Sequence, residues 1–371
     1  MEESTHEIEM ASAAPLSISV IVPAYNAEAT LGACLAPLLR MQSAGEILEI
    51  ILVDDGSSDA TPAIAAQAGV RTMPSGGRLG PGGARNAAAA SARGDVLWFV
   101  DADAVVHADA ARVLSVALAD GAFAAVFGAY DDRPSANSFW SQYKNLVHHH
   151  YHRQSSREAE TFWAGCGAIR KAAFLEVGGF DASRFAQPSI EDIELGWRLR
   201  QGGFRILLAP ELQATHLKVW ELRNLLHTEI FQRALPWSRL IHRRTGWPDT
   251  LNVSRGERLR AILAVAFLVS LPLTWVPLWL SFALLVAAVA ANRRLVALFN
   301  RRRGRLFALG AILFHQVYYG YCAGAFIWAW QEQWRLRFRG AGADDDRVAS
   351  ATGSPDLVTL PRSTLAAATE E

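Results

Sequence analysis

Cysteine is scarce in this chain, and its few copies lie far apart. Cys34, Cys166 and Cys322 are the only three in 371 residues. This spacing suggests neither a Cys-x-x-Cys metal site nor a disulfide framework, and it is typical of a reducing compartment. We expect the three thiols to be small buried core groups.

An excess of charge of either sign is also missing, since Lys and Arg together number 36 and so do Asp and Glu. The balance gives no reason to expect a nucleic-acid partner. Residues 1–15 are acidic and lack the basic-then-apolar layout of a secretion signal, so the chain before residue 250 is expected to stay in the cytoplasm. Residues 1–15 and 340–371 are expected to be disordered tails.

Charge is absent altogether from two long apolar runs. Residues 261–291 carry no charged side chain, and residues 306–330 carry none apart from a histidine. Each run exceeds the roughly 20 apolar residues that cross a bilayer as a helix. We therefore expect two or three transmembrane helices within residues 259–335, in a multi-pass protein of the cell (inner) membrane whose catalytic domain is cytoplasmic.

Two prolines, Pro272 and Pro277, interrupt the first run and leave its topology open. Two short helices joined by a tight turn, or a re-entrant hairpin, would return the basic residues 292–305 to the cytoplasm, in line with the positive-inside bias. One strongly tilted span would leave them outside. Residues 221–258 mix Trp and Leu with Arg and are typical of amphipathic helices at a membrane interface.

Strand and helix patterns alternate in the N-terminal half of the chain. Apolar, β-branched runs within 16–26, 47–55 and 95–100 predict strands, and residues 27–41, 61–69 and 85–94 have the spacing of helices. This alternation predicts an α/β domain with a mostly parallel sheet covered by helices. Ligands of such sheets bind at the carboxyl ends of the strands. The residues at those ends are Tyr25, Asp54, Asp55, Asp101 and Asp103.

Asp101 and Asp103 are separated by one residue, so on an extended backbone both side chains point to the same face. Two adjacent carboxylates are unfavourable unless one is protonated or a cation lies between them. Mg²⁺ and Mn²⁺ take carboxylate oxygens and typically share their sites with substrate phosphates. The pair therefore predicts a divalent-metal site.

A run of histidines, HHHYH, occupies residues 148–152. Adjacent side chains of a helix point in different directions, and only His148 and His152 share a face. We expect structural or acceptor-facing roles for these histidines.

Five stretches resemble, in order and approximate spacing, the motifs of family 2 glycosyltransferases with the GT-A fold. They are SVIVPAYNAEATLGACLAPLL, ILVDDGSSDAT, GPGGARNAAAASARGDVLWFVDADA, FWAGCGAIRKAAFLEVGGFD and EDIELGWRLRQGGFRI. The resemblance covers residues 17–206, about half of the chain, and the apolar segments resemble those of the family's membrane-bound branch. It implies a Rossmann-like GT-A catalytic domain over residues 16–220 followed by an α-helical membrane domain. It also implies a nucleotide-diphosphate sugar donor, Mg²⁺ or Mn²⁺, and inversion at the anomeric carbon.

Carried over position by position, the resemblance implies how the donor is bound. The implied nucleotide-sugar residues are Pro23, Tyr25, Glu28, Asp55, Arg85 and Asp101. The implied metal ligands are Asp103 and Asp101, with His216 as a tentative third. Arg85 would lie near the phosphates at a helix N-terminus, although a surface ion pair is the alternative for this residue.

The stretch EDIELGWRLR, residues 191–200, supplies the remaining chemistry. By resemblance, Asp192 is the general base that takes the proton of an acceptor hydroxyl. Glu191, Trp163 and Gly165 are the implied acceptor-side residues. For Glu191 the alternative is an acidic first helical turn that the helix dipole favours. A phosphate acceptor is already ionised and would need no base.

The expected reaction transfers a sugar, with UDP as the expected nucleotide, to a membrane-associated acceptor such as a polyprenyl phosphate or a lipid-linked saccharide. A polysaccharide synthase on the same scaffold is an alternative, but its Gln-x-x-Arg-Trp motif is only echoed by FQRALPW at 231–237. A dinucleotide-dependent oxidoreductase would need Gly-x-Gly-x-x-Gly after the first strand, where this chain has VPAYNAE. An inactive nucleotide-sugar-binding protein is the third alternative, and the acids at 101, 103 and 192 argue against it.

Overall fold

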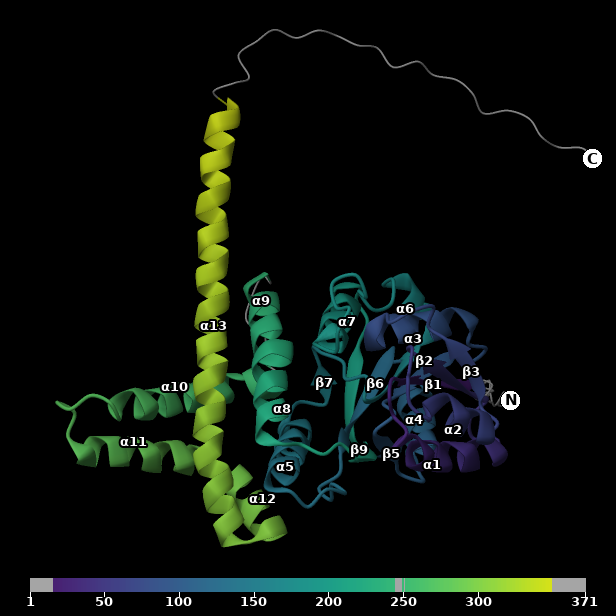
Figure 1. Cartoon of the computed structure of the whole chain (residues 1–371), viewed down its shortest axis with the longest axis horizontal. Helices are drawn as coiled ribbons and strands as arrows, with labels where there is room; N and C mark the ends of the chain where they lie inside the picture. Colours follow the sequence, from purple (N-terminus) through teal and green to yellow (C-terminus); the bar gives the residue numbers. More distant parts are fainter. Residues whose placement is uncertain (1–15, 244–248, 250, 349–371) are drawn as a thin grey trace, which may run out of the picture.

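The computed structural model describes residues 16–243, 249 and 251–348. They form an α/β domain and a C-terminal group of helices (Figure 1). Residues 1–15 and 349–371, which belong to the two expected tails, lie outside the described residues. The last helix continues to Val348, past residue 340 where the C-terminal tail was expected to begin.

A nine-stranded sheet forms the centre of the domain, in the order β3-β2-β1-β4-β8-β6-β9-β5, with β7 paired to β9. The strands are β1 Ile18–Ala24, β2 Glu49–Asp54, β3 Arg71–Pro74, β4 Val96–Val100, β5 Ala104–Val106, β6 Ala125–Tyr130, β7 Glu158–Ala159, β8 Cys166–Arg170 and β9 Ile206–His216. The helices of this part are α1 Leu31–Ser43, α2 Thr61–Gln67, α3 Gly80–Ser91, α4 Ala110–Leu118, α5 Phe139–Gln154, α6 Lys171–Glu176 and α7 Glu191–Gln201.

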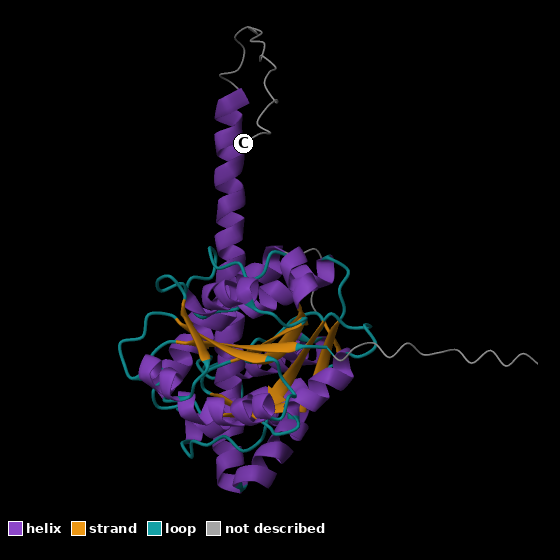
Figure 2. Ribbon diagram, turned by 90° about the vertical axis from the view of Figure 1, so that its right-hand side faces the viewer, coloured by secondary structure: helices purple, strands orange, loops and turns teal. Residues whose placement is uncertain are grey.

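The first half of the sheet is parallel, because β3, β2, β1 and β4 pair in the same direction. Beyond it, β8 runs antiparallel to both β4 and β6. Figure 2 shows the sheet between helices on both faces. Every residue of β4 is buried, which explains why its sequence is a continuous apolar run. The predicted α/β fold with strands at these places is confirmed, with a sheet that is mixed beyond its parallel half.

The carboxyl ends of β1, β2 and β4 meet at one edge of the sheet because the three strands are parallel neighbours. The backbone after β4 is not extended: residues 101–103 form a turn in which the Ala104 N–H donates to the Asp101 carbonyl at 2.9 Å. The prediction of an extended backbone at this pair is therefore wrong. A second short strand, β5, begins at once after Asp103 and pairs with β9 instead of continuing β4.

Phe99 of β4 fills the core directly behind this edge. Its ring is fully buried and lies 5.4 Å from that of Phe180 and 5.5 Å from that of Phe174. We expect Phe99→Ala to lower the free energy of unfolding by about 3–5 kcal/mol, because it removes a large buried ring and leaves a cavity. Urea denaturation of the purified protein in detergent would measure this. Val116→Ala is the matched control, since Val116 is 70% exposed on α4, and an equal loss in both variants would contradict the prediction.

The remaining helices follow the domain in the chain. They are α8 Leu222–His227, a π-helical turn Thr228–Ala234, α9 Leu235–Arg243, a 3-10 turn Leu251–Val253, α10 Arg255–Ser270, α11 Leu278–Ala291, α12 Arg293–Arg303 and α13 Arg305–Val348. In Figure 1, α13 is the long upright helix, with α8 and α9 between it and the sheet. Helices α10 and α11 form a hairpin that projects from α13 on the side away from the sheet.

By length and composition, one helix within the described residues, Arg305–Leu336, can cross a membrane. A second span is obtained only if Leu278–Ala291 and Arg293–Arg303, which are bent by 73° at their junction, count as one segment. The structure therefore supports one transmembrane span, or two at most, among the described residues, and the expected multi-pass topology stays a prediction. The uncharged run 261–291 forms two short helices because a turn containing Pro272 and Pro277 separates them.

Candidate active site

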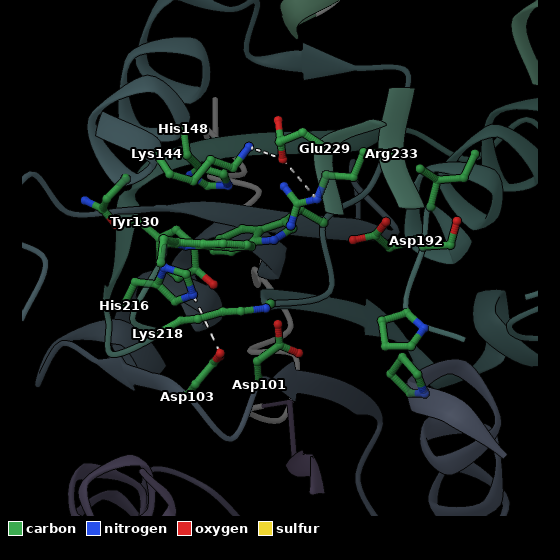
Figure 3. A pocket seen from close by; sticks show the side chains of 18 of the residues that line it. Asp101, Asp103, Tyr130, Lys144, His148, Asp192, His216, Lys218, Glu229 and Arg233 are labelled. Atoms are coloured by element: carbon green, nitrogen blue, oxygen red, sulfur yellow. Dashed lines mark ion pairs between the residues drawn. The ribbon is translucent and has the colours of Figure 1, made fainter. Parts of the chain in front are cut away.

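A cavity of about 960 Å³ opens at the strand-end edge of the sheet. It is lined at one end by Pro23, near the end of β1, and by Tyr25, which follows that strand. At the other end it is lined by Tyr318 and Cys322 of α13. Figure 3 shows acids at one side of this space and basic side chains facing them. The cavity therefore joins the carboxyl ends of the strands to the C-terminal helices.

The Tyr25 side chain, at the donor end, is 40% exposed. The Arg78 guanidinium carbon lies 3.9 Å from the centre of its ring. A flat, exposed aromatic ring with a cation over its face is a suitable surface for a planar base. Pro23 and Tyr25 both line the cavity, as expected for a nucleotide end.

Asp55 and Glu28, by contrast, do not line the cavity. Both oxygens of Asp55 accept backbone hydrogen bonds at the start of α3, from Leu79 at 2.8 Å and from Gly80 at 2.9 Å. Glu28 accepts a hydrogen bond from the Ala60 N–H at 3.0 Å and so joins the loops that follow β1 and β2. In the structure, these two carboxylates hold loops in place around the donor end.

Arg85 links two acids that are far apart in the sequence. Its guanidinium donates to Asp101 Oδ1 at 2.6 Å and to Glu191 Oε1 at 3.3 Å. Arg85 is only 3% exposed, so the alternative of a surface ion pair does not hold. Burial raises the pKa of Asp101 above its usual value, although Arg85 opposes this. The end of β4 and the start of α7 are thereby held together by one buried cation.

Asp103 faces His216, with 3.7 Å between Oδ2 and Nε2 (Figure 3). The His216 ring is held by stacking on Tyr130, with ring centres 4.1 Å apart. Burial favours the neutral form of Asp103, but His216 and Lys218 outweigh it and keep the pKa of this carboxyl below its usual value. The structure thus brings two of the predicted metal ligands together from β9 and the turn after β4.

Asp192 lies in the first turn of α7 and lines the cavity. Its Oδ2 accepts a hydrogen bond from the Ala164 N–H at 3.1 Å, and its Oδ1 accepts one from the Ile193 N–H at 2.8 Å. Burial, together with the charge of neighbouring Glu191, raises the pKa of Asp192 to about 7. A carboxyl with this pKa can accept a proton near neutral pH.

An aromatic wall lies between the acids and α5. The Trp163 ring contacts Tyr130 and His148, each at 4.7 Å between ring centres. His148 and His152 share one face of α5, with ring centres 3.9 Å apart. Gly165 leaves the space that the Trp163 ring fills, since a Cβ at Gly165 would lie 2.5 Å from that ring. Trp163 and Gly165 line the cavity.

A group of basic residues that the sequence did not indicate lines the cavity opposite the acids. Lys144 Nζ of α5 pairs with Glu229 Oε1 at 2.6 Å, and Arg233 Nε lies 3.6 Å from the same oxygen (Figure 3). Lys218 adds a third cation, whose Nζ lies 4.2 Å from the centre of the Trp220 ring. We call Lys144, Lys218 and Arg233 the basic group. With one acid among three cations, its net charge suits an anionic ligand.

Arg233 of the basic group and the acid Glu229 both lie in the π-helical turn Thr228–Ala234. Wider turns of this kind are frequent at functional sites.

The residues that the structure describes contain no ready cluster of three His, Cys, Asp or Glu side chains around one point. Two ligands of one Mg²⁺ or Mn²⁺ lie about 3 Å apart when each is about 2.1 Å from the ion. The 3.7 Å between Asp103 Oδ2 and His216 Nε2 is somewhat longer than that spacing. A small movement would let the two side chains serve as ligands of one ion, whose remaining ligands would have to come from elsewhere, such as a substrate diphosphate.

Residues 19–178 match the model of the family described as Glycosyl transferase family 2. This part of the chain belongs to glycosyltransferase family 2. The glycosyltransferase domain carries the parallel half of the sheet, the two acids after β4 and most of the donor end of the cavity. The predicted enzyme class and GT-A fold are confirmed, whereas Asp192, His216 and the basic residues Lys218 and Arg233 lie beyond the matched residues.

Two curated glycosyltransferases are similar to this chain over part of their length. A beta-monoglucosyldiacylglycerol synthase of Synechocystis sp. is 27% identical over 259 residues, which are 64% of this chain and 52% of that protein. An N-acetylglucosaminyl-diphospho-decaprenol L-rhamnosyltransferase of Mycobacterium tuberculosis is 28% identical over 208 residues, 46% of this chain and 67% of that protein. This glycosyltransferase therefore spans about half the length of the first relative.

Among solved structures, the glycosyltransferase aligns with a mannosyltransferase from Pyrobaculum calidifontis in complex with GDP-Man and Mn²⁺. The alignment has a TM-score of 0.46 and 19% identity, and it covers 84% of this chain and 87% of that one.

Proposed function

We propose that this glycosyltransferase moves a sugar, with inversion, from a nucleotide-diphosphate sugar, UDP-linked by preference, to a lipid-linked acceptor at a membrane surface. The observation that carries the proposal is the cavity, which runs from the strand-end acids past the basic group to α13. Its two ends suit the two substrates, a nucleotide at Tyr25 and a lipid-borne anion near the C-terminal helices. The lipid acceptors in the names of the two curated relatives support the second half of the proposal.

At the donor end, the nucleotide base of the donor would lie against Pro23 and Tyr25. The diphosphate of the donor would be directed toward the turn after β4. Asp103, His216 and Asp101 would hold Mg²⁺ or Mn²⁺. When bound, such an ion would neutralise the negative charge of the diphosphate as it leaves. Arg85 is already engaged by Asp101 and Glu191, so its main task would be to hold the two acids at a fixed spacing.

At the acceptor end, Asp192 would take the proton from a hydroxyl of the lipid-linked acceptor. The hydroxyl oxygen would then form a bond to the anomeric carbon while the bond from that carbon to the diphosphate oxygen breaks. The leaving nucleoside diphosphate takes the electron pair. The hydrogen bond from the Ala164 N–H orients Asp192 toward the cavity, and its raised pKa suits proton transfer near neutral pH.

The basic group would bind the phosphate or diphosphate that joins the acceptor to its lipid. We expect Arg233→Met to raise KM for the lipid acceptor by roughly tenfold to a hundredfold, because one charge-assisted hydrogen bond to the phosphate is lost. Release of nucleotide without acceptor should be unchanged. Membranes containing the protein would be incubated with a panel of radiolabelled nucleotide sugars, and label would be counted in the extracted lipid.

Arg243→Met is the matched control, since Arg243 is an exposed arginine near the end of α9. It should transfer sugar as the unaltered protein does. If no nucleotide sugar labels the lipid fraction, the proposed acceptor class is wrong. If Arg243→Met and Arg233→Met are equally impaired, the basic group does not bind the acceptor.

A further inference from the structure

The hairpin of α10 and α11 has the dimensions of a segment that enters a bilayer without crossing it. Helix α11 has 14 residues, which gives a length of about 21 Å. The hydrocarbon core of a bilayer is about 30 Å thick, and apolar helices this short are typical of re-entrant or interfacial segments. No charged residue occurs between Ala261 and Asn292, so both arms are apolar up to the turn that joins them.

The outer end of the hairpin is covered with exposed apolar side chains. Trp275, Leu278 and Trp279 are exposed to 77%, 87% and 70%, values that are unusual for large apolar residues in water. Across the two arms, the Ser270 hydroxyl donates to that of Ser281 at 2.9 Å, so these two polar groups are satisfied within the hairpin. An apolar surface with its polar groups paired suits hydrocarbon.

The base of the hairpin is fixed to the rest of the molecule by a buried polar network. Glu257 accepts hydrogen bonds from the hydroxyls of Tyr319 at 2.7 Å and Tyr151 at 3.1 Å. Arg260 donates to the Ala291 carbonyl at 2.9 Å and so joins the two arms where they meet α13. The hairpin is therefore held at a set angle to α13, as Figure 1 shows.

Helix α13 is covered along one side by the catalytic domain and α9. Ring contacts begin with Phe139 on Phe307, 5.0 Å between ring centres, and an Arg239–Glu332 ion pair at 2.6 Å lies at the other end. From Phe307 to Glu332 the helix rises about 38 Å, more than a hydrocarbon core. If α13 crossed a bilayer, α5, α9 and this ion pair would lie at the level of the lipid tails, at a large cost in desolvation.

The opposite side of α13 is apolar and open. Leu309, Leu313 and Val317 recur at helical spacing and are exposed to 58%, 42% and 44%. This stripe faces the side from which the hairpin projects, because Leu268 of α10 packs on Gly320 one turn further along. The hairpin and the open side of α13 therefore look in one direction, and the catalytic domain lies behind them (Figure 1).

We propose that the protein is held in one leaflet of a bilayer, with the α10–α11 hairpin inserted among the lipid tails and α13 lying along the membrane surface. Arginines at the hairpin base, Arg255 and Arg258 on one arm and Arg293 and Arg294 after the other, lie where anionic head groups would be. No helix crosses the membrane in this arrangement. It does not depend on the reaction proposed above, and it differs from the multi-pass topology that the sequence predicts.

The first test asks on which side of the membrane the two ends of α13 lie. Single cysteines would replace Asn300, before α13, and Ser354, after it, in the Cys322→Ser background, whose remaining thiols, Cys34 and Cys166, are buried. We expect a membrane-impermeant maleimide to label both positions from the face of sealed vesicles that carries the catalytic domain. Labelling of Ser354→Cys only after the vesicles are opened would mean that α13 crosses the bilayer and would overturn the proposal.

The second test asks whether the hairpin tip enters lipid. We expect the double variant Leu278→Asp, Trp279→Asp to lose vesicle binding on the order of a hundredfold, because carboxylates are unfavourable among lipid tails. Flotation with vesicles of phosphatidylethanolamine and phosphatidylglycerol would measure it. Val116→Asp, an exposed apolar residue of α4, is the matched control and should bind as before. Circular dichroism would verify that both variants fold.

Unchanged flotation of the double variant would overturn the proposal. So would a change from dimer to monomer in the double variant while vesicle binding persists, since the apolar surface would then be an interface between two copies of the chain.

Discussion

Asp192→Asn is expected to lower kcat by about a hundredfold to ten-thousandfold, the usual effect of removing a general base. The unaltered protein should show kcat/KM rising with pH and levelling off above about 7, because burial raises the pKa of Asp192 to about 7 and only its ionised form can accept the proton. An ordinary aspartate would place this rise near pH 4. In Asp192→Asn the rise near pH 7 should disappear. Initial rates of transfer to the lipid fraction between pH 5 and 9, an interval chosen to span that pKa by about two units each way, would measure both effects.

Asp109→Asn is the matched control for charge, because Asp109 is exposed and pairs with Arg112 on the surface of α4. It should leave both kcat and the pH profile unchanged. A variant at Asp192 that retains full activity would contradict the assignment of the base. It would favour an acceptor that attacks through an ionised phosphate.

Asp103→Ala is expected to abolish transfer, and EDTA should do the same to the unaltered protein. Asp103 is half-buried, yet its pKa stays below the usual value because His216 and Lys218 face it. Its carboxylate is therefore charged and available to a cation. Its removal would leave His216 as the only ligand of the facing pair. We expect a loss of kcat/KM of roughly a thousandfold or more, of the size seen when a principal electrostatic contact to a leaving group is removed. Addition of Mn²⁺ or Mg²⁺ after EDTA should restore the unaltered protein but not the variant.

Asp120→Asn, an exposed acid in the loop after α4, is the control for this measurement. Transfer that persists in EDTA would contradict the metal role of Asp103. If Asp103→Ala lost activity while the unaltered protein was insensitive to EDTA, the carboxylate would act through His216 or Lys218 without a cation.

The sheet and its acidic edge could be predicted from the sequence because their signals are local. β4 is an apolar run of five residues followed at once by Asp101, and a parallel neighbour brings Tyr25 to the same edge. The relation of Asp101 to Glu191 was not predictable in this way. It depends on Arg85, which pairs with nearby Asp101 and also with Glu191, 106 positions further along the chain.

The basic group was missed for a related reason. Lys144 lies in a helix whose sequence is dominated by histidines and aromatics, and Arg233 lies in a stretch that resembles an interfacial helix. Neither has a local pattern that indicates an anion site. Only the packing of α5 against the π-helical turn brings Lys144 to Glu229. Helix α13 is a similar case. Its composition indicates a transmembrane span, but its packing against α9 covers one side of the helix and leaves the opposite side exposed.

Helix α5 connects the acceptor end of the cavity to the base of the hairpin, because it carries both Lys144 and Tyr151. The Tyr151 hydroxyl donates to Glu257 at the start of α10. Lys144 and Tyr151 are about 10 Å apart along the helix axis. With the hairpin seated in lipid, this rigid link would set the height of Asp192 above the head groups. The enzyme would then select its acceptors by the length of the head group. Lipids whose head group reaches that height would be substrates, and lipids with shorter head groups would not.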